Sequence, residues 1–270
     1  MKSCFFFHNP KAGGTSLRNA LAAHFSPDAV CPTADLTPDV YRAQARPVEP
    51  GYQLYFGHYG YDICRQVAGE HALITNFRHP AKRIVSLYKY FRYAVPNTPS
   101  VQSDPIYFAV RQAKSADFES FVLSTDPRIT TYTHNHHFRQ LANSGWSLNH
   151  SRTLDDVIDL IDQMTWFYMC EFPDLSVRWA RKALDASDFK LPRDNVSSTS
   201  AAPSADVLQL SEAAYTRLLD MNQVDLAIYA HALERFFFET RNASPPLRAT
   251  SVEAARRTPC SSALELALAS

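Results

Sequence analysis

The chain has 270 residues, of which 46% are hydrophobic and 20% charged, a composition typical of folded rather than disordered or collagen-like proteins. The 27 Lys and Arg residues balance the 27 Asp and Glu residues, and this zero net charge excludes a protein that coats nucleic acid or an anionic membrane with its whole surface. The charge is uneven along the chain, because residues 1–100 hold 11 basic and 6 acidic residues and six of the seven glycines. We therefore look for an anionic ligand in this basic N-terminal part.

Apolar runs alternate with helical patterns along the chain. Short runs such as CFFFHNP are typical of buried strands, whereas the spacing of Leu17, Leu21 and Phe25 is typical of a helix. Proline fits the first turn of a helix that begins at Pro80, and Thr153 is predicted to cap another. In chain order we expect strand 4–10, helix 15–25, an irregular segment 26–51, strands 52–58 and 71–78, helix 80–93, a loop 94–105, helices near 106–125 and at 153–164, strand 166–172, helix 174–185, a loop 192–204, and helices 206–220 and 222–239.

This order of elements predicts an α/β fold. Strands that alternate with helices favour a central parallel sheet flanked by crossover helices. We expect one domain over residues 1–242 and a weakly ordered tail over 243–270. Ligands of such sheets bind beyond the carboxyl ends of the strands.

Cysteine usage and hydropathy indicate a cytoplasmic setting. The five cysteines are odd in number and form no C-x-x-C pair, which favours neither a disulfide framework nor a zinc site. No apolar run is long enough for a signal peptide or a membrane span. We therefore expect a soluble protein in a reducing compartment.

The first candidate motif, PKAGGTS at residues 10–16, joins the end of a predicted strand to the start of a predicted helix. Paired glycines permit a sharp turn and a close approach to backbone N–H groups. The two hydroxyl residues that follow lie at a helix N-terminus, where the dipole favours an anion, and a lysine adds positive charge. A simple glycine turn with a threonine cap remains the alternative. The candidate ligands of a phosphate or sulfate are Lys11, Ala12, Gly13, Gly14, Thr15 and Ser16.

The second candidate motif, NFRHPAKRIVSLYKYFR at residues 76–92, carries five basic residues and no acid. Arg78 falls at the end of a predicted strand, and Ser86 lies two turns into the next helix. An arginine fork and a serine hydroxyl suit a phosphate monoester. A basic amphipathic helix with a solvated face is the alternative.

Taken together, PK-x-GGTS followed by R-x-P-x-x-R-x-x-S-x-Y resembles the sulfotransferase family, and most closely the branch of heparan sulfate 2-O- and uronyl sulfotransferases with their bacterial relatives. The resemblance implies a P-loop-like three-layer fold. It also implies that the first motif holds the 5′-phosphosulfate of 3′-phosphoadenosine 5′-phosphosulfate (PAPS), and that Arg78 and Ser86 hold its 3′-phosphate. The family's Golgi members carry a membrane anchor, for which this chain has no room, so we expect a soluble bacterial form.

Weaker similarities extend over about residues 4–240. YFGHYGYD at 55–62 is similar to the family segment whose Gly-His supplies the catalytic base, which implies that role for His58. HNHHFRQL at 134–141 is similar to N-x-Q-T-R-x-L, with departures at His137 and Phe138. His79 stands where many members have Asp, which weakens the predicted helix cap. The late stretch around LPRDNVS at 191–197 is also similar.

The reaction implied is transfer of a sulfuryl group to an acceptor hydroxyl, which we expect to belong to a carbohydrate. Lys11 would stabilise charge on the leaving phosphate, and His58 would act as general base because its ordinary pKa of about 6.5 suits proton removal near neutral pH. The alternative is that His58 is a histidine in a turn whose ring N–H is hydrogen-bonded and that has no catalytic role. The carboxylates that could replace it are those of Glu49, Asp62 and Glu70.

Other residues are assigned more general roles. Segment 94–150 is expected to shape the acceptor cleft, with Asn135 and Arg139 on a polar face. We expect no metal, because His134, His136 and His137 lack the spacing of a metal motif. Aromatic residues in polar loops are candidate sugar platforms, and a late polar loop is a candidate lid over the cofactor. These residues are Tyr132 and Trp146, and Arg193, Asn195, Ser197 and Ser198.

Two other functions compete with sulfuryl transfer. A kinase that uses ATP would need the lysine after the glycines, as in G-x-x-x-x-G-K-[ST], whereas here the lysine comes first. A non-catalytic nucleotide-binding protein would keep the anion site without turnover. The identity of the acceptor and the oligomeric state stay open, and no nucleic-acid partner is expected.

Overall fold

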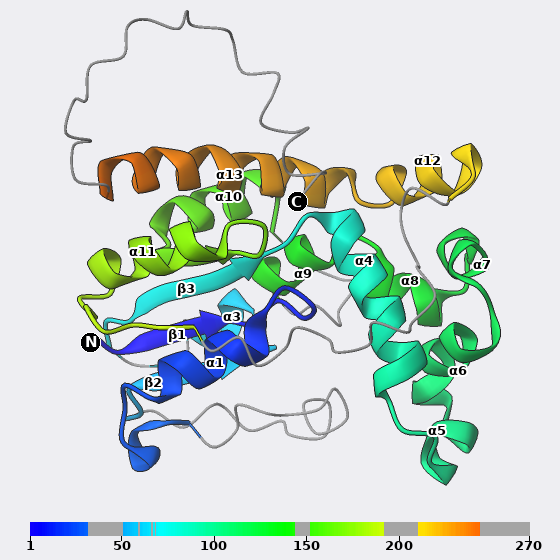
Figure 1. Ribbon diagram of the computed structural model, residues 1–270, viewed down its shortest axis with the longest axis horizontal. Coiled ribbons are helices and arrows are strands. Elements are labelled where there is room, and N and C mark those ends of the chain that lie inside the picture. The colour runs from blue at the N-terminus through cyan, green and yellow to red at the C-terminus, as the bar shows by residue number, and fades with distance from the viewer. Residues whose placement is uncertain are drawn as a thin grey trace, which may run out of the picture.

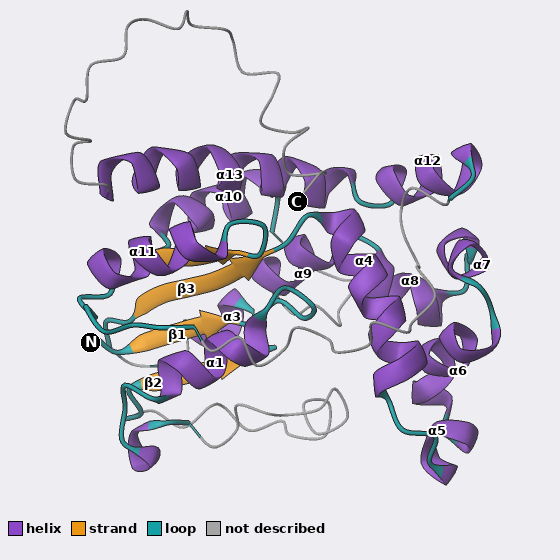
Figure 2. Ribbon diagram, in the orientation of Figure 1, coloured by secondary structure: helices purple, strands orange, loops and turns teal. Residues whose placement is uncertain are grey.

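The computed structural model describes residues 1–31, 51–58, 60–65, 67, 69–143, 152–191 and 210–243. Its centre is a four-stranded, all-parallel sheet in the order β2-β1-β3-β4 (Figures 1 and 2). The strands are β1 (Cys4–Phe7), β2 (Leu54–Gly57), β3 (Ala72–Phe77) and β4 (Trp166–Met169). The predicted α/β fold with a central parallel sheet is therefore confirmed.

The strands are apolar runs because both faces of the sheet are covered. Every residue of β1, β2 and β4 is buried, as is common where helices cover both sides of a parallel sheet. Phe5 pairs with Tyr55 of β2 on one side and with Leu73 of β3 on the other. All four strands lie where the sequence predicts them, with shorter bounds because the residues after each strand turn into loops.

Helices surround this sheet. They are α1 (Gly14–Ala22), α3 (Tyr61–Cys64), α4 (Pro80–Lys89), α5 (Pro99–Ser103), α6 (Phe108–Ser115), α7 (Phe118–Leu123), α8 (Pro127–Thr133), α9 (His136–Ala142), α10 (Leu154–Gln163), α11 (Pro173–Ala183), α12 (Glu212–Asp220) and α13 (Gln223–Ala243), with short 3₁₀ turns at Pro27–Ala29 and Pro105–Tyr107 and a π-helical turn, η3, at Tyr90–Ala94.

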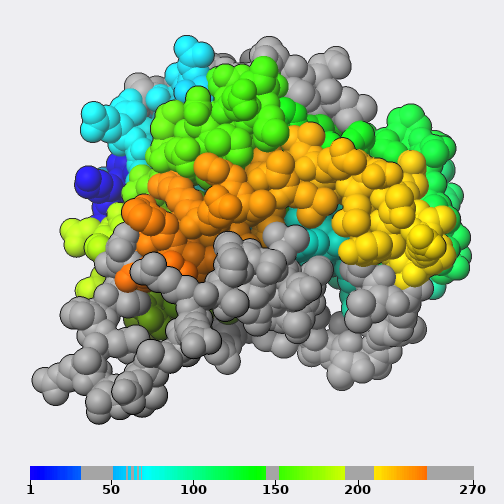
Figure 3. Space-filling model, turned by 90° about the horizontal axis from the view of Figure 1, so that it is seen from above, coloured from blue at the N-terminus to red at the C-terminus, as the bar shows by residue number. Residues whose placement is uncertain are grey.

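Two apolar clusters hold these elements together. The larger cluster joins the sheet to α1, α9, α10, α11 and α13. The smaller one joins α4 to α6, α7, α8 and α12, which form a separate helical group on the right of Figure 1. Seen from above in Figure 3, α12 and α13 follow one another along one face of the molecule. Helix α4 links the two clusters, because it begins at the sheet and ends in the helical group.

The sequence predicts most helices but misses three features. Helix α10 has the predicted Thr153 cap, and Asp156 completes a capping box. The single helix expected near 106–125 is wrong, because the Asp117 side chain accepts the Ser120 N–H at 2.8 Å and starts a new helix there. Part of the expected loop 94–105 is also helical, since Thr98 caps α5. Helices α8 and α9 were not predicted.

Three observations bear on the ends and the setting of the chain. No helix in the described ranges is long and apolar enough to cross a membrane. Cys4, Cys31, Cys64 and Cys170 carry free thiols. Helix α13 ends at Ala243, so the tail predicted beyond it lies outside the described residues, as do 206–209 of the expected helix 206–220.

Candidate anion site

The carboxyl ends of the strands meet at one edge of the sheet, because all four strands are parallel. The chain leaves β1 toward β2 and leaves β3 toward β4, so the two connections diverge between neighbouring strands β1 and β3. Open α/β sheets bind their ligands at such a point. The predicted anion loop follows β1 and Arg78 follows β3, so the fold brings both predicted elements to this point. His58 follows β2 on the other side of the loop.

Two buried asparagines fix the loop between β1 and α1. The Asn76 side-chain amide donates to the carbonyls of Asn9 and Ala12 at 2.9 and 2.7 Å, and its oxygen accepts the Asn9 N–H at 2.8 Å. The Asn9 side chain donates in turn to the Asn76 carbonyl at 2.9 Å. Both side chains are fully buried, so these bonds satisfy backbone groups that water does not reach. Sequence reasoning missed both residues, although an asparagine inside the apolar run LITNF was a signal.

Removing this amide should destabilise the whole domain. We expect Asn76→Ala to lower the free energy of unfolding by about 3 kcal/mol, because it leaves several buried backbone groups without a partner. Urea unfolding measures the loss. Asn19→Ala, which removes an exposed asparagine of α1, is the matched control and should change stability by less than about 0.5 kcal/mol. Equal stability of the two variants would contradict this role for Asn76.

The two glycines of the loop are required for different reasons. Gly13 caps α1 with a φ of 78°, and a Cβ there would lie 2.8 Å from Cε1 of Tyr168. This is the backbone freedom that the sequence predicts. At Gly14 a Cβ would lie 1.9 Å from Nε2 of His8, so the space beside this glycine holds an imidazole. That side of Gly14 is therefore filled by the His8 ring, and the expected approach of a ligand to the backbone N–H groups of the loop stays a prediction.

The start of α1 still offers donors to an anion. The N-cap residue, Gly13, has no side chain, and within the described ranges no side chain accepts a hydrogen bond from the first N–H groups of α1. Gly13 and Thr15 are exposed, whereas Ala12 and Ser16 are buried. Of the two predicted hydroxyls, that of Thr15 is therefore the more accessible to a ligand.

Two cations lie together beside the loop. Nζ of Lys11 lies 3.8 Å from the centroid of the Tyr90 ring, and Nη1 of Arg78 donates to the Lys11 carbonyl at 3.3 Å. Burial, and then the nearby charge of Arg78, lower the pKa of Lys11 to about 8. Within the described ranges neither cation forms an ion pair with a carboxylate. Two uncompensated cations beside a helix N-terminus favour an anionic ligand.

Ser86 lies one turn before Tyr90, at the end of α4. Ser86 and Tyr90 are four residues apart and share a helix face, and the Tyr90 ring contacts Lys11. As predicted, His79 supplies no side-chain cap. A carboxylate nevertheless lies at this helix start, because Glu171 accepts the His79 backbone N–H at 3.0 Å.

His58 is held by His8, the residue that directly follows β1. Its Nδ1 lies 3.0 Å from the carbonyl oxygen of His8, and the two imidazole rings stack with their centroids 4.7 Å apart. A carbonyl only accepts hydrogen bonds, so Nδ1 of His58 carries the hydrogen. Nε2 is then the nitrogen that can accept a proton in the neutral ring.

No described contact places any of the alternative carboxylate bases at the edge of the sheet where the strands end. Glu70 is exposed and lies two residues before β3, at the opposite edge of the sheet, which argues against it as the base. Glu49 lies outside the described residues, as does the side chain of Asp62. The same holds for Trp146, Arg193, Asn195, Ser197 and Ser198.

The predicted polar acceptor face on α9 is wrong, because its residues join helices to one another. Arg139 is 4% exposed and donates to the backbone carbonyls of His134 and Thr131. The Asn135 side chain accepts the Asp225 N–H at 3.2 Å. The Asp225 carboxylate in turn caps α9, accepting the N–H groups of His137 and Phe138 at 3.0 and 2.8 Å.

Two further predictions concern rings and metals. Tyr132 belongs to α8 rather than to a loop, and its ring packs edge-on against Phe91 at 5.3 Å, which argues against a sugar platform there. His136 and His137 are buried within α9. The described ranges hold no group of three or more potential metal ligands. The expected absence of a metal stays a prediction.

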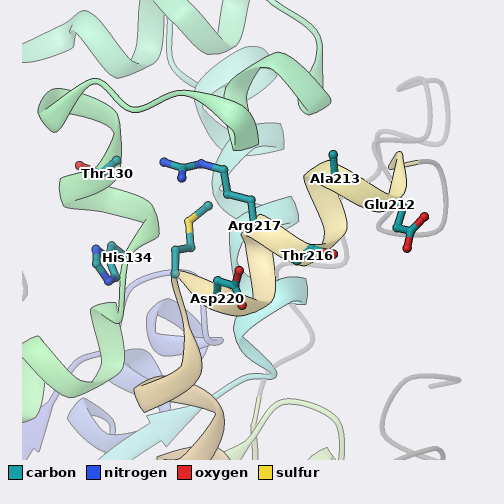
Figure 4. A pocket seen from close by; sticks show the side chains of 8 residues that line it. Thr130, His134, Glu212, Ala213, Thr216, Arg217 and Asp220 are labelled. Carbon is teal, nitrogen blue, oxygen red and sulfur yellow. The ribbon is translucent and has the colours of Figure 1, made fainter.

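A cavity of about 670 Å³ lies elsewhere, between α8 and α12 (Figure 4). Arg217 points into it from α12, while Glu212 and Asp220 bring opposing charge to the same rim. None of the predicted anion ligands lines it. Its lining residues are Thr130, His134, Glu212, Ala213, Thr216, Arg217, Asp220 and Met221.

Two comparisons with known proteins identify no relative of this chain. No protein-family model matches the chain, and no curated protein matches it. The resemblance to sulfotransferases therefore rests on the two motifs and on their placement in the fold.

Proposed function

We propose that this protein is a sulfotransferase that moves the sulfuryl group of PAPS to an acceptor hydroxyl, with a carbohydrate as the acceptor class. One observation carries the proposal: the loop that holds Lys11 and the residue Arg78 lie together where the connections of β1 and β3 diverge. A helix N-terminus and two cations without a carboxylate partner in the described ranges fit a ligand with several anionic groups.

The cradle would bind and orient the donor. Backbone N–H groups at the start of α1 and the Thr15 hydroxyl would hold the phosphosulfate end, while Arg78 and Ser86 would hold the 3′-phosphate. Sulfuryl transfer resembles phosphoryl transfer in that positioning and charge stabilisation carry most of the catalysis. The bound donor supplies an activated sulfate, and the remaining chemistry falls to side chains of this chain.

Two side chains would act on the reacting atoms. Nε2 of His58 would take the proton of the acceptor hydroxyl as its oxygen forms a bond to sulfur. The bond between sulfur and the bridging phosphate oxygen breaks at the same time, and the Lys11 ammonium would stabilise the charge left on that phosphate. Lys11 follows β1 and His58 follows the neighbouring strand β2, and this placement supports the division of roles.

Ligand affinity tests the proposal directly. We expect adenosine 3′,5′-bisphosphate to bind more tightly than ATP in isothermal titration calorimetry. Arg78→Ala should weaken bisphosphate binding about 30- to 100-fold, because it removes a charge-assisted hydrogen bond of about 2–3 kcal/mol. Arg78→Lys should recover part of this loss, since a point charge replaces the fork.

The matched control is Arg128→Ala. Arg128 is exposed and paired with Asp126 at 2.7 Å, so its removal should leave bisphosphate affinity unchanged. Tighter binding of ATP would favour the kinase alternative. Equal bisphosphate affinity of Arg78→Ala and the unmodified protein would contradict the assignment of Arg78.

A further inference from the structure

His8 lies between the anion loop and His58, although neither motif assigned it a role. It follows β1 directly, and its ring stacks with two others, since the ring centroid of Phe6 lies 5.4 Å away and that of His58 lies 4.7 Å away. Both stacks are nearly parallel, with interplanar angles of 22° and 28°. The His8 ring is therefore held in one place by its neighbours.

The first turn of α1 fixes the same ring from another direction. The side chain that any other residue would carry at position 14 would collide with the His8 imidazole, since the Cβ would lie 1.9–2.0 Å from Nε2 and Cδ2. Glycine at this position thus makes room for the His8 ring against the helix N-terminus. The ring touches the proposed phosphosulfate cradle on one side and the proposed base on the other.

The backbone of His8 contacts His58 as well. Its carbonyl oxygen lies 3.0 Å from Nδ1 of His58 and can only accept. His58 therefore meets His8 twice, through a hydrogen bond at one ring edge and through a stacked ring on one face. Two such contacts fix both the tautomer and the plane of an imidazole, which is the usual way in which a catalytic histidine is oriented.

We propose that His8 is a positioning residue for His58: its carbonyl and ring together hold the His58 imidazole in one orientation, with Nε2 as the proton-accepting nitrogen. The catalytic meaning of this arrangement rests on the proposed function, whereas the orientation itself does not. His8 holds the ring and takes no part in bond making.

The charges around His8 suit a neutral ring. Burial first, and then the neighbouring His58, Arg18 and Lys11, lower the pKa of His8 well below its usual value. The same surroundings of α1 place the positive end of a helix dipole nearby. A neutral His8 can stack on His58 without repelling a proton that His58 receives.

Nuclear magnetic resonance of the His58 ring tests the orientation without an activity assay. A hydrogen-bonded Nδ1–H that is held in place should give an observable ¹⁵N-bound proton signal in the unmodified protein. The variant His8→Ala keeps the backbone carbonyl and removes the stacked ring, so we expect this signal to weaken through faster exchange of the proton with water. In the proposed reaction the same variant should lower kcat about 10-fold and leave the KM for PAPS unchanged.

A steric cycle provides an independent test of the packing. Gly14→Ala should lower the midpoint of thermal unfolding by about 5 °C, because the added methyl group collides with His8. In the His8→Ala background the same substitution should cost much less. Equal costs in both backgrounds would overturn the proposed packing of His8.

His24→Ala is the matched control, because His24 is also a stacked imidazole, 5.7 Å from Phe189, and lies away from the strand edge. It should leave the His58 signal and kcat unchanged. A His58 signal that is unchanged in His8→Ala would overturn the proposed role of the His8 ring. Absence of sulfuryl transfer by the unmodified protein would instead refute the proposed function, and the His58 signal and the steric cycle would still decide the role of His8.

Discussion

Replacing His58 by alanine should lower the rate of sulfuryl transfer by about 10²- to 10⁴-fold, the usual contribution of a positioned general base. The structure gives the physical reason, since the bond from Nδ1 to the His8 carbonyl leaves Nε2 as the nitrogen that can accept a proton. Transfer is measured with a radiolabelled sulfate donor and a panel of carbohydrate acceptors. The same panel identifies the acceptor.

Binding of adenosine 3′,5′-bisphosphate separates catalysis from folding in this variant. Its affinity for His58→Ala should match that of the unmodified protein, because Arg78, Ser86 and the anion loop are untouched. The control His71→Ala removes a histidine that directly precedes β3, at the opposite edge of the sheet, and should retain full activity. Full activity of His58→Ala would show that His58 is not the general base and that another residue takes the proton of the acceptor.

The protein should lose stability steeply as the pH falls from about 6.5 to 4. Burial lowers the pKa of both His79 and His137 to about 4, with Lys82 adding to the effect at His79. Asp225 opposes the shift at His137, whereas Arg83 and His79 reinforce it. The unfolded chain takes up protons at these histidines below about pH 6.5, and the folded chain does so only near pH 4.

This difference in bound protons sets the direction and the size of the change in the free energy of unfolding with pH. Because the unfolded state binds more protons between the two pKa values, the free energy of unfolding falls as the pH is lowered. Each of the two histidines should contribute about 1.4 kcal/mol per pH unit within that window. Above about pH 6.5 both states are neutral at these sites, so the contribution no longer changes.

Urea unfolding at several pH values between 7.5 and 4.5 measures this effect. The variant His137→Gln should show a shallower dependence on pH, because one buried titrating group is gone. A free energy of unfolding that stays constant between pH 6.5 and 4.5 would contradict the burial of neutral imidazoles beside α4 and α9.

The sheet could be predicted from the sequence because its strands are buried on both faces. Continuous apolar runs such as CFFF and WFYM are typical of strands in the centre of a parallel sheet, and the sequence therefore predicts the strands at Cys4–Phe7 and Trp166–Met169. Helix boundaries in the smaller cluster were harder. The break before α7 depends on one side-chain bond from Asp117, and an apolar pattern that continues across the break conceals it.

The two candidate motifs could be placed at strand ends because their signals are local. Glycines, hydroxyls and a lysine occur together within seven residues, and Arg78 follows an apolar run directly. Asn76 and His8 could not be predicted in this way, because their roles depend on contacts with residues far away in the sequence. The same reason explains the wrong prediction of a polar acceptor face around Arg139. The buried carboxylate near this segment, that of Asp225, lies on α13, far along the chain.

The strand order also has a consequence for how the chain is synthesised. Strand β3 receives its outer neighbour only when β4 has been made, because Ile74 pairs with Trp166 and helices α4 to α10 lie between them in the sequence. Until then the β3 edge exposes unpaired backbone groups beside apolar side chains, which is a surface that recruits other extended chains. Completion of the sheet on the ribosome therefore waits until α4 to α10 have been made, and a nascent chain that stalls before β4 would carry an open, aggregation-prone edge.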